Sequence, residues 1–289
     1  MRLLSYIADE RGSFGVALDD GSIVDLRNRL GLRSLRELLE NGALAAAAAT
    51  AKSAQPDFRL TDVRLLPTVP NPQKIICIGV NYGDRNAEYR DDSDQPKYPS
   101  VFIRTRESLV GHAEPIMRPP ESEQLDYEGE IVIVIGKSGR RIPRKQAWDH
   151  IAGLSLMNEG SVRDWLRHAK FNVTQGKNFA RSGAFGPWMV TTDELDPRQN
   201  LHLTTHVNGD LRQDDTTANL IFPFDYLISY LSTFLEFRPG DVIATGTPTG
   251  AGARFDPPKY LRHGDRVTVH VPGIGTLSNL VADERVATV

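Results

Sequence analysis

The stretch LDYEGEIVIVIGK, residues 125–137, decides the fold because it joins spaced acids to a run of apolar residues. Asp126, Glu128 and Glu130 stand two residues apart, a spacing that turns side chains to the same side of an extended strand. Residues 131–135 are all Ile or Val, so they place apolar side chains on both faces. We therefore predict a buried strand whose first residues carry acids beside a cleft.

These acids allow two interpretations. Carboxylates at strand ends are usually solvated, which is the simplest explanation of an isolated Glu-x-Glu. At the end of a buried strand, however, Glu128 and Glu130 would repel each other unless one is protonated or a cation lies between them. The burial predicted for this strand favours a bound metal ion.

A third acid, Glu159, lies in LSLMNEGSVRDW, where an apolar segment meets a helix predicted to begin near Ser161. It is either a third ligand or a residue that stabilises the positive end of that helix. Three carboxylates without a nearby Cys or His pair suit Mg²⁺ or Mn²⁺, suit Ca²⁺ less well, and disfavour zinc.

Composition limits the classes of function. The chain has 289 residues, of which 40% are hydrophobic and 25% charged, as expected for one large globular domain or two smaller ones. The formal net charge of −3 argues against a general nucleic-acid surface. Charges come too early in the first ten residues for a signal peptide, and no apolar run approaches the roughly 20 residues that span a bilayer. We expect a cytoplasmic protein without a membrane segment, and we interpret Cys77 as a buried structural thiol.

Residues 1–70 are predicted to form a small N-terminal α+β domain, with alternating strands over 13–26 and a helix over 34–53. Prolines at 67, 70 and 72 mark its end, and residues 71–289 are predicted to form the main domain, which holds nearly every chemical signal. There we expect two helices, over 161–171 and 224–237, among strands over 74–80, 100–105, 130–136, 202–209, 241–247 and 266–273. This order favours a mixed β structure over alternating βα units. The glycine-rich stretch 245–252 lacks the Lys-Ser or Lys-Thr of a nucleotide loop, so we interpret it as a turn or a close approach to substrate.

Seven motifs give the chain a recognisable resemblance. In order they are GVNYGDRNAEY, SLVGHAEPI, LDYEGEIVIVIGK, MNEGSVRDW, GKNFARSGAFGPW, NGDLRQDDTT and PGDVIATGTPTGAG. Together they resemble the fumarylacetoacetate hydrolase family over residues 71–285. The resemblance implies an α+β, mainly β fold, a mixed β-sandwich roll, in a homodimer whose Mg²⁺ or Mn²⁺ is held by Glu128, Glu130 and Glu159. The family more often has Asp at the last position, so Glu159 is a departure.

The same resemblance implies an activity. Substrates of this family are typically 2-oxo or 2,4-dioxo acids, so we expect hydrolysis of a carbon–carbon bond in an acylpyruvate-like acid, which releases pyruvate or a related 2-oxo acid. Lys177 matches a lysine beside the bound acid and would stabilise an oxyanion or a carboxylate, unless it is a solvated surface lysine. Arg104 would grip a carboxylate, although a surface arginine is the alternative. The substrate-binding positions implied are Tyr82, Arg85, Arg104, Gln213 and Thr247.

One departure bears on the reaction itself. Many hydrolases and decarboxylases of the family carry His-x-x-Glu where this chain has Arg85 and Glu88. Arginine stays protonated near neutral pH and cannot serve as that base. Either Glu88 is the catalytic base alone while Arg85 binds a second carboxylate, or the reaction needs no activated water. His112 and His168 are the other candidates for the missing imidazole, although His168 also fits a helix-surface pair with Asp164.

The departure keeps several activities open. An isomerase, a hydratase or a decarboxylase acting on a 2-oxo acid remains possible beside the hydrolase. So does a catalytically silent protein that only binds an oxo acid.

Overall fold

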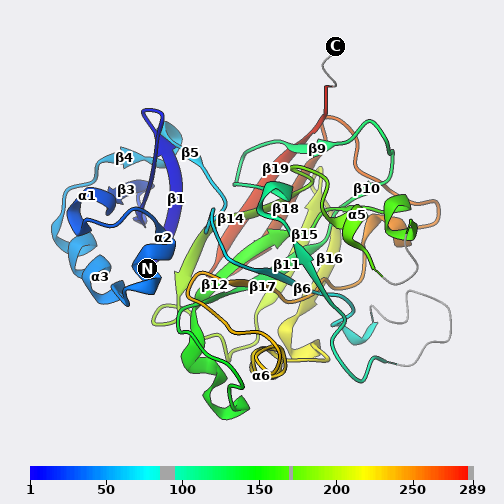
Figure 1. Cartoon of the computed structure of the whole chain (residues 1–289). Helices are drawn as coiled ribbons and strands as arrows, with labels where there is room; N and C mark the ends of the chain where they lie inside the picture. The colour runs from blue at the N-terminus through cyan, green and yellow to red at the C-terminus, as the bar shows by residue number, and fades with distance from the viewer. Residues whose placement is uncertain (85–94, 169–171, 286–289) are drawn as a thin grey trace.

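The computed structural model describes residues 1–84, 95–168 and 172–285, and strands predominate in them. They form a large sheet of twelve strands, a second sheet of five and a separate pair (Figure 1). The mainly β fold with mixed sheets that the sequence predicted is confirmed.

The large sheet follows the order β4-β3-β2-β1-β14-β12-β11-β17-β6-β7, with β5 beside β1 and β8 beside β14. Most neighbouring strands in it are antiparallel, whereas β17–β6 and β14–β8 are parallel. Its strands are β1 (Arg2–Ala8), β2 (Arg11–Ala17), β3 (Ser22–Asp25), β4 (Phe58–Arg59), β5 (Arg64–Leu65), β6 (Ile75–Ile78), β7 (Val101–Arg104), β8 (Leu109–Val110), β11 (Gly129–Ile135), β12 (Ile151–Asn158), β14 (Gly183–Thr191) and β17 (Val242–Ala244).

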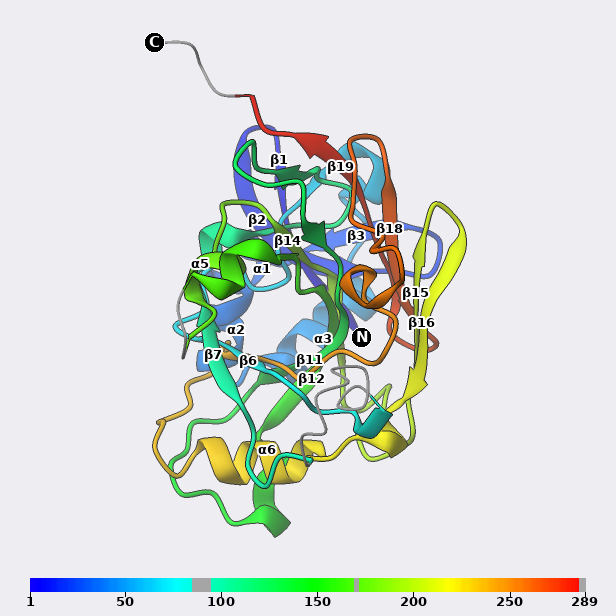
Figure 2. The ribbon, with the colours of Figure 1, turned by 90° about the vertical axis from the view of Figure 1, so that its right-hand side faces the viewer.

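The second sheet has the order β16-β15-β18-β19-β9 and packs over β11, β12 and β14 of the large sheet. In Figure 2, β15, β16 and β18 lie on one side of the molecule and α5 and β7 on the other. The strands are β9 (Ile116–Arg118), β15 (His202–Val207), β16 (Asp210–Thr216), β18 (Arg266–Val271) and β19 (Gly275–Asp283), and the separate pair is β10 (Leu125–Asp126) with β13 (Ser161–Val162).

The helices of the described residues are short and peripheral. The α-helices are α1 (Arg27–Leu30), α2 (Leu35–Glu40), α3 (Leu44–Ser53), α5 (Thr174–Lys177) and α6 (Phe224–Leu231). The 3₁₀ helices are η1 (Leu60–Asp62), η2 (Arg106–Ser108), η3 (Arg144–His150), η4 (Asp164–Arg167), η5 (Thr217–Asn219) and η6 (Gly252–Arg254).

Three helix predictions need correction. The helix expected over 34–53 is two helices, because Gly42 has a left-handed φ of 62° between them. The helix expected over 161–171 is wrong in its described part, since 161–162 pair with β10 and 164–167 form a 3₁₀ turn. The helix expected over 224–237 ends at Leu231, because the chain then turns so that Phe237 bridges to Gly139.

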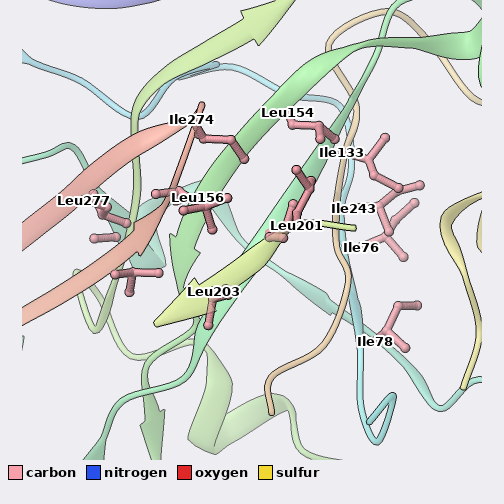
Figure 3. Close-up of a cluster of buried hydrophobic side chains, with 14 of the residues drawn as sticks. Ile76, Ile78, Ile133, Leu154, Leu156, Leu201, Leu203, Ile243, Ile274 and Leu277 are labelled. Carbon is pink, nitrogen blue, oxygen red and sulfur yellow. The ribbon is translucent and has the colours of Figure 1, made fainter. Parts of the chain in front are cut away.

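The two apolar faces of β11 have different partners. Ile131, Ile133 and Ile135 face a cluster that includes residues of the second sheet (Figure 3). Val132 and Val134 face a cluster that includes N-terminal residues such as Phe14 and Leu35. Each fully buried aliphatic side chain contributes about 1.5–3 kcal/mol, so a strand covered on both sides is strongly fixed. β11 is therefore a rigid support for the acids that precede and begin it.

The N-terminal segment is joined to the main sheet by backbone pairing. In β1, Arg2 pairs with Val190 and Leu3 with Met189 of β14. The large sheet contains strands from before and after residue 70, and the domain boundary predicted there stays a prediction. Cys77 is a buried free thiol, as expected. Within the described ranges, no helix is long and apolar enough to cross a membrane.

Candidate metal centre

The β11–β12 ladder brings the three glutamates together. Gly129 pairs with Asn158, and the amide of Glu159 donates to the carbonyl of Glu128 at 2.7 Å, so these two acids stand opposite each other. Glu130 is the second residue of β11. One carboxylate oxygen from each of the three lies within 4.8 Å of the others, and all three side chains are buried. Because no α-helix begins near Ser161, the alternative that Glu159 caps a helix is wrong.

Asp126 does not share this site, although its spacing predicted the same side of one strand. β10 ends at Asp126 and β11 begins at Gly129, so no single strand carries all three acids of the motif. The Asp126 carboxylate instead accepts hydrogen bonds from the amides of Gly252 at 2.8 Å and Ala253 at 3.0 Å. It anchors the end of the glycine-rich stretch 245–252.

Three cationic side chains contact the glutamates: Arg104 bonds to Glu159 from behind, and Lys177 and Arg163 line the cavity. The Lys177 ammonium, at the end of α5, donates to Oε2 of Glu128 and to Oε2 of Glu159, so Lys177 is not a surface lysine. Arg163 donates from Nη2 to Glu128 Oε1 and from Nε to Asp126, both at 2.7 Å. Arg163 is not among the site residues predicted from the sequence, because it lies in the range 161–171 that was wrongly predicted as a helix. Its position in the motif MNEGSVRDW, four residues after Glu159, is the signal that pointed to it.

Glu130 has a different environment. Its Oε2 accepts a hydrogen bond from the Gly246 amide at 2.8 Å, and no cationic side chain of the described residues bonds to it. The backbone φ of Gly246 is 103°, a conformation that favours glycine. A Cβ at this position would lie 2.7 Å from the Asn81 Cβ. Burial raises the pKa of Glu130 well above its usual range, and repulsion from Glu159 and Glu128 raises it further.

The charges of the cluster leave room for a cation. Within the described residues, the four acids at 126, 128, 130 and 159 face the three bases at 104, 163 and 177, so one negative charge is unmatched when all four acids are ionised, as they would be around a bound cation. Burial lowers the pKa of Lys177, but the contacts with Glu128 and Glu159 outweigh it and the net pKa is raised. Lys177 thus stays an ammonium. Three convergent carboxylates without sulfur or imidazole donors fit a hard ion such as Mg²⁺ or Mn²⁺.

A cavity of about 160 Å³ opens onto these side chains. It is well below the roughly 300–1,000 Å³ of drug-sized pockets, so the described walls suit a short ligand. Its polar lining residues are Ser100, Glu128, Glu130, Glu159, Arg163, Lys177 and Thr247. The remaining lining residues are Ile78, Gly79, Val80, Phe102, Leu166 and Val173, and no histidine occurs among the described lining residues.

Gln213 and Thr247 hold the backbone between the first two glutamates. Gln213 accepts from the Gly129 amide at 2.9 Å and donates to Thr247 Oγ1 at 2.8 Å, and that hydroxyl donates to the Gly129 carbonyl at 3.0 Å. Thr247 also lines the cavity, whereas Gln213 is buried behind it. Both residues fix the Glu-x-Glu backbone.

The other predicted residues are dispersed. Tyr82 is buried and bridges through its backbone to Leu220, and Arg104 is buried behind Glu159. His112 accepts from the Ser278 amide at 3.1 Å, and the His168 ring lies 4.3 Å from that of Trp165. None of these four is among the described residues that line the cavity. Arg85 and Glu88 lie outside the described residues.

Comparison with known proteins settles the family. Residues 74–282 match the family model described as fumarylacetoacetate hydrolase, C-terminal. The chain belongs to the fumarylacetoacetate hydrolase family. Among relatives in this family, oxaloacetate tautomerase YisK of Bacillus subtilis is 40% identical over 227 residues, which cover 78% of this chain and 75% of that protein. The mitochondrial oxaloacetate tautomerase fahd2 of Xenopus laevis is 38% identical over 292 residues, 97% of this chain and 90% of the relative.

Solved structures of the family agree with the fold. The maleylpyruvate hydrolase of Sphingobium sp. SYK-6, solved with manganese(II) and pyruvate, superimposes with a TM-score of 0.81 at 26% identity. The match covers 99% of this chain and 100% of that structure.

Proposed function

We propose that this chain is a divalent-metal-dependent enzyme that interconverts the keto and enol forms of a short 2-oxo dicarboxylic acid, with oxaloacetate as the first candidate. The observation that carries the proposal is a small cavity where three glutamates, Lys177 and Arg163 converge without a histidine among the described lining residues. Keto–enol interconversion moves a proton between C3 and the oxygen on C2, and it consumes no water. The two tautomerases at 38–40% identity support this choice over the hydrolysis expected from the sequence.

Mg²⁺ or Mn²⁺ would be held by Glu128, Glu130 and Glu159, and when bound it would polarise the oxo group and favour negative charge on its oxygen. The proposal covers both Mg²⁺ and Mn²⁺, since three carboxylates suit either ion.

Lys177 supplies the second positive charge. Its ammonium is buried, bonded to Glu128 and Glu159, and lies 5.1 Å from the centre of the Phe102 ring. A fixed donor of this kind stabilises an oxygen that gains charge without having to reorganise. We assign Lys177 to the oxygen on C2, to which it can give a proton.

Arg163 is suited to a substrate carboxylate. Its Nε and Nη2 are held by Asp126 and Glu128, while its Nη1 has no partner within the described ranges. Arginine forms strong directional hydrogen bonds with carboxylates. A dicarboxylic acid would therefore gain an anchor at Arg163 that an acid with a neutral tail lacks.

Glu88 is the proton acceptor of this scheme, proposed from its sequence position alone. It takes the proton from C3 while the oxygen on C2 receives one, so the product is an isomer of the substrate. Arg85, beside it in the sequence, cannot activate water as the usual histidine would. A reaction without water is consistent with that replacement.

A second candidate is hydrolysis of a 2,4-dioxo acid. The apolar wall made by Ile78, Val80, Phe102 and Leu166 favours it, because such a wall suits an uncharged acyl group. This reaction would release pyruvate from an acylpyruvate. The homodimer implied by the family resemblance and the cytoplasmic location also remain proposals.

The test follows the enol form of oxaloacetate by its ultraviolet absorbance, with metal-loaded protein and with protein treated with EDTA. We expect metal-dependent acceleration of enol decay beyond the spontaneous rate, with total oxaloacetate unchanged. Pyruvate release from acylpyruvates without that acceleration would establish the hydrolase instead, and carbon dioxide from oxaloacetate would indicate a decarboxylase. Tight binding without turnover would indicate a silent binder.

A further inference from the structure

Arg104 lies behind Glu159 and away from the cavity. It is the last residue of β7, its side chain is buried, and it is not among the described residues lining the cavity. This position does not suit the contact with a substrate carboxylate that the sequence predicted. Its contacts point to a different task.

Every nitrogen of the Arg104 guanidinium has a protein acceptor. Nη1 donates to Glu159 Oε1 at 2.5 Å and to the Gly160 carbonyl at 2.7 Å. Nε donates to Ser108 Oγ at 3.0 Å, and Nη2 donates to Ser182 Oγ at 3.0 Å and to the Ser108 carbonyl at 3.4 Å. These bonds hold the planar guanidinium in one orientation. A lysine ammonium, which is a compact charge, cannot make the same set of hydrogen bonds.

The two oxygens of Glu159 are divided between two cations. Oε1 bonds to Arg104 on the interior side, and Oε2 bonds to Lys177, which lines the cavity. Glu128 is divided in the same way, with Oε1 on Arg163 and Oε2 on Lys177. In both glutamates an arginine bonds to Oε1, and Lys177 bonds to Oε2.

We propose that Arg104 is a positioning residue for metal binding: by holding Oε1 it fixes the Glu159 side chain so that Oε2 faces the site of the ion. The inference rests on the proposed metal centre. A ligating carboxylate is commonly oriented by an outer hydrogen-bond partner, and loss of such a partner typically weakens metal binding about 10–100-fold. Arg104 acts through Glu159 and does not touch the substrate.

The experiment compares Arg104→Lys with Arg106→Lys by calorimetric titration of the metal-free proteins with Mn²⁺. Arg104→Lys keeps the positive charge but loses the planar guanidinium, so we expect about 10–100-fold weaker binding of Mn²⁺. Arg106 is the matched control, because it lies two residues away with its side chain 65% exposed and paired with Glu107. Arg106→Lys should bind Mn²⁺ as the unaltered protein does.

A second readout separates positioning from general damage to the fold. At saturating Mn²⁺ the Arg104→Lys protein should regain most of its kcat, while the Mn²⁺ concentration for half-maximal activity stays raised. Equal Mn²⁺ affinity of Arg104→Lys and the unaltered protein would overturn the inference and leave the metal centre intact. Failure of the unaltered protein to bind Mn²⁺ would instead overturn the metal centre itself.

If Arg104→Lys does not fold, Ser182→Ala serves in its place. It removes one support of the guanidinium without removing the charge. A several-fold loss of Mn²⁺ affinity, with the melting temperature of the metal-free protein near its normal value, would support the inference. Unchanged affinity would overturn it.

Discussion

The backbone amide of Glu159 donates to the backbone carbonyl of Glu128 at 2.7 Å, so the two acids face each other where the β11–β12 ladder ends. A peptide hydrogen bond thus sets the spacing of two carboxylates that repel each other. The strands below are buried on both faces, and their packing resists separation of the acids. The Lys177 ammonium bridges these two acids, so the repulsion that remains acts on Glu130, which has no cationic partner among the described residues.

Glu130→Gln tests the repulsion that Glu128 and Glu159 exert on Glu130. The amide oxygen of Gln can still accept from Gly246, while the buried charge disappears. We expect the metal-free variant to be more stable than the metal-free parent by on the order of 1 kcal/mol. It should also bind Mn²⁺ about 100-fold more weakly, because a charged ligand becomes neutral and this should cost no less than the loss of an outer partner of a ligand. Thermal unfolding and calorimetry measure the two effects. Glu123→Gln, at an exposed position, is the control and should change neither.

Lys177→Met separates binding of the ion from chemistry. Methionine fills similar volume without the ammonium that contacts Glu128 and Glu159. We expect kcat for enol conversion to fall about 10²–10³-fold, the usual loss for one preorganised donor, while Mn²⁺ binding persists or tightens. Lys137→Met, at an exposed residue, should leave both unchanged. Weaker Mn²⁺ binding with an unchanged kcat at saturating metal would contradict the role assigned to Lys177.

Metal addition should stabilise the whole chain. A ligand present at 100 times its dissociation constant adds about 2.7 kcal/mol to the free energy of unfolding, which corresponds to a rise of about 5 °C or more in Tm. Differential scanning calorimetry with Mn²⁺ and then with excess EDTA measures this shift and its reversal. The double variant Glu128→Gln, Glu159→Gln should show no shift; an equal shift there would mean that the ion binds elsewhere.

Gly246→Ala tests the turn that supplies the amide to Glu130. The backbone φ of 103° is strained for alanine, and the new Cβ would meet Asn81. We expect a loss of about 1–3 kcal/mol in unfolding free energy together with weaker Mn²⁺ binding. Gly264→Ala is a matched control, because Gly264 also has a positive φ, 88°, but nothing lies within 4 Å of its Cβ position. That variant should lose stability and keep its Mn²⁺ affinity.

Much of the strand architecture follows from local patterns. The strands expected over 130–136 and 241–247 occur as β11 (Gly129–Ile135) and the shorter β17 (Val242–Ala244), because a short apolar run is a local signal of a buried strand. The helix predicted over 161–171 is wrong in its described part because Ser161 and Val162 pair with β10, a contact between distant segments that overrides local helix propensity.

The three acids of the site and Lys177 were predicted, whereas Arg163 and the position of Arg104 were not. The spacing of Glu128 and Glu130 before a buried strand indicated a metal site, and the family resemblance added Glu159, whose alternative role as a helix cap the local sequence left open. The place of Arg104 depends on how β7, η2 and the segment before β14 meet, since its acceptors are Ser108, Glu159, Gly160 and Ser182. No pattern within one segment carries that information.

The most direct test of the central claim is anomalous diffraction from crystals grown with Mn²⁺ and oxalate, a mimic of a 2-oxo acid carboxylate. The account predicts one manganese peak within bonding distance of a carboxylate oxygen from each of Glu128, Glu130 and Glu159, with oxalate on its open side. Absence of a peak among these three side chains, at an ion concentration that saturates the calorimetric titration, would contradict it.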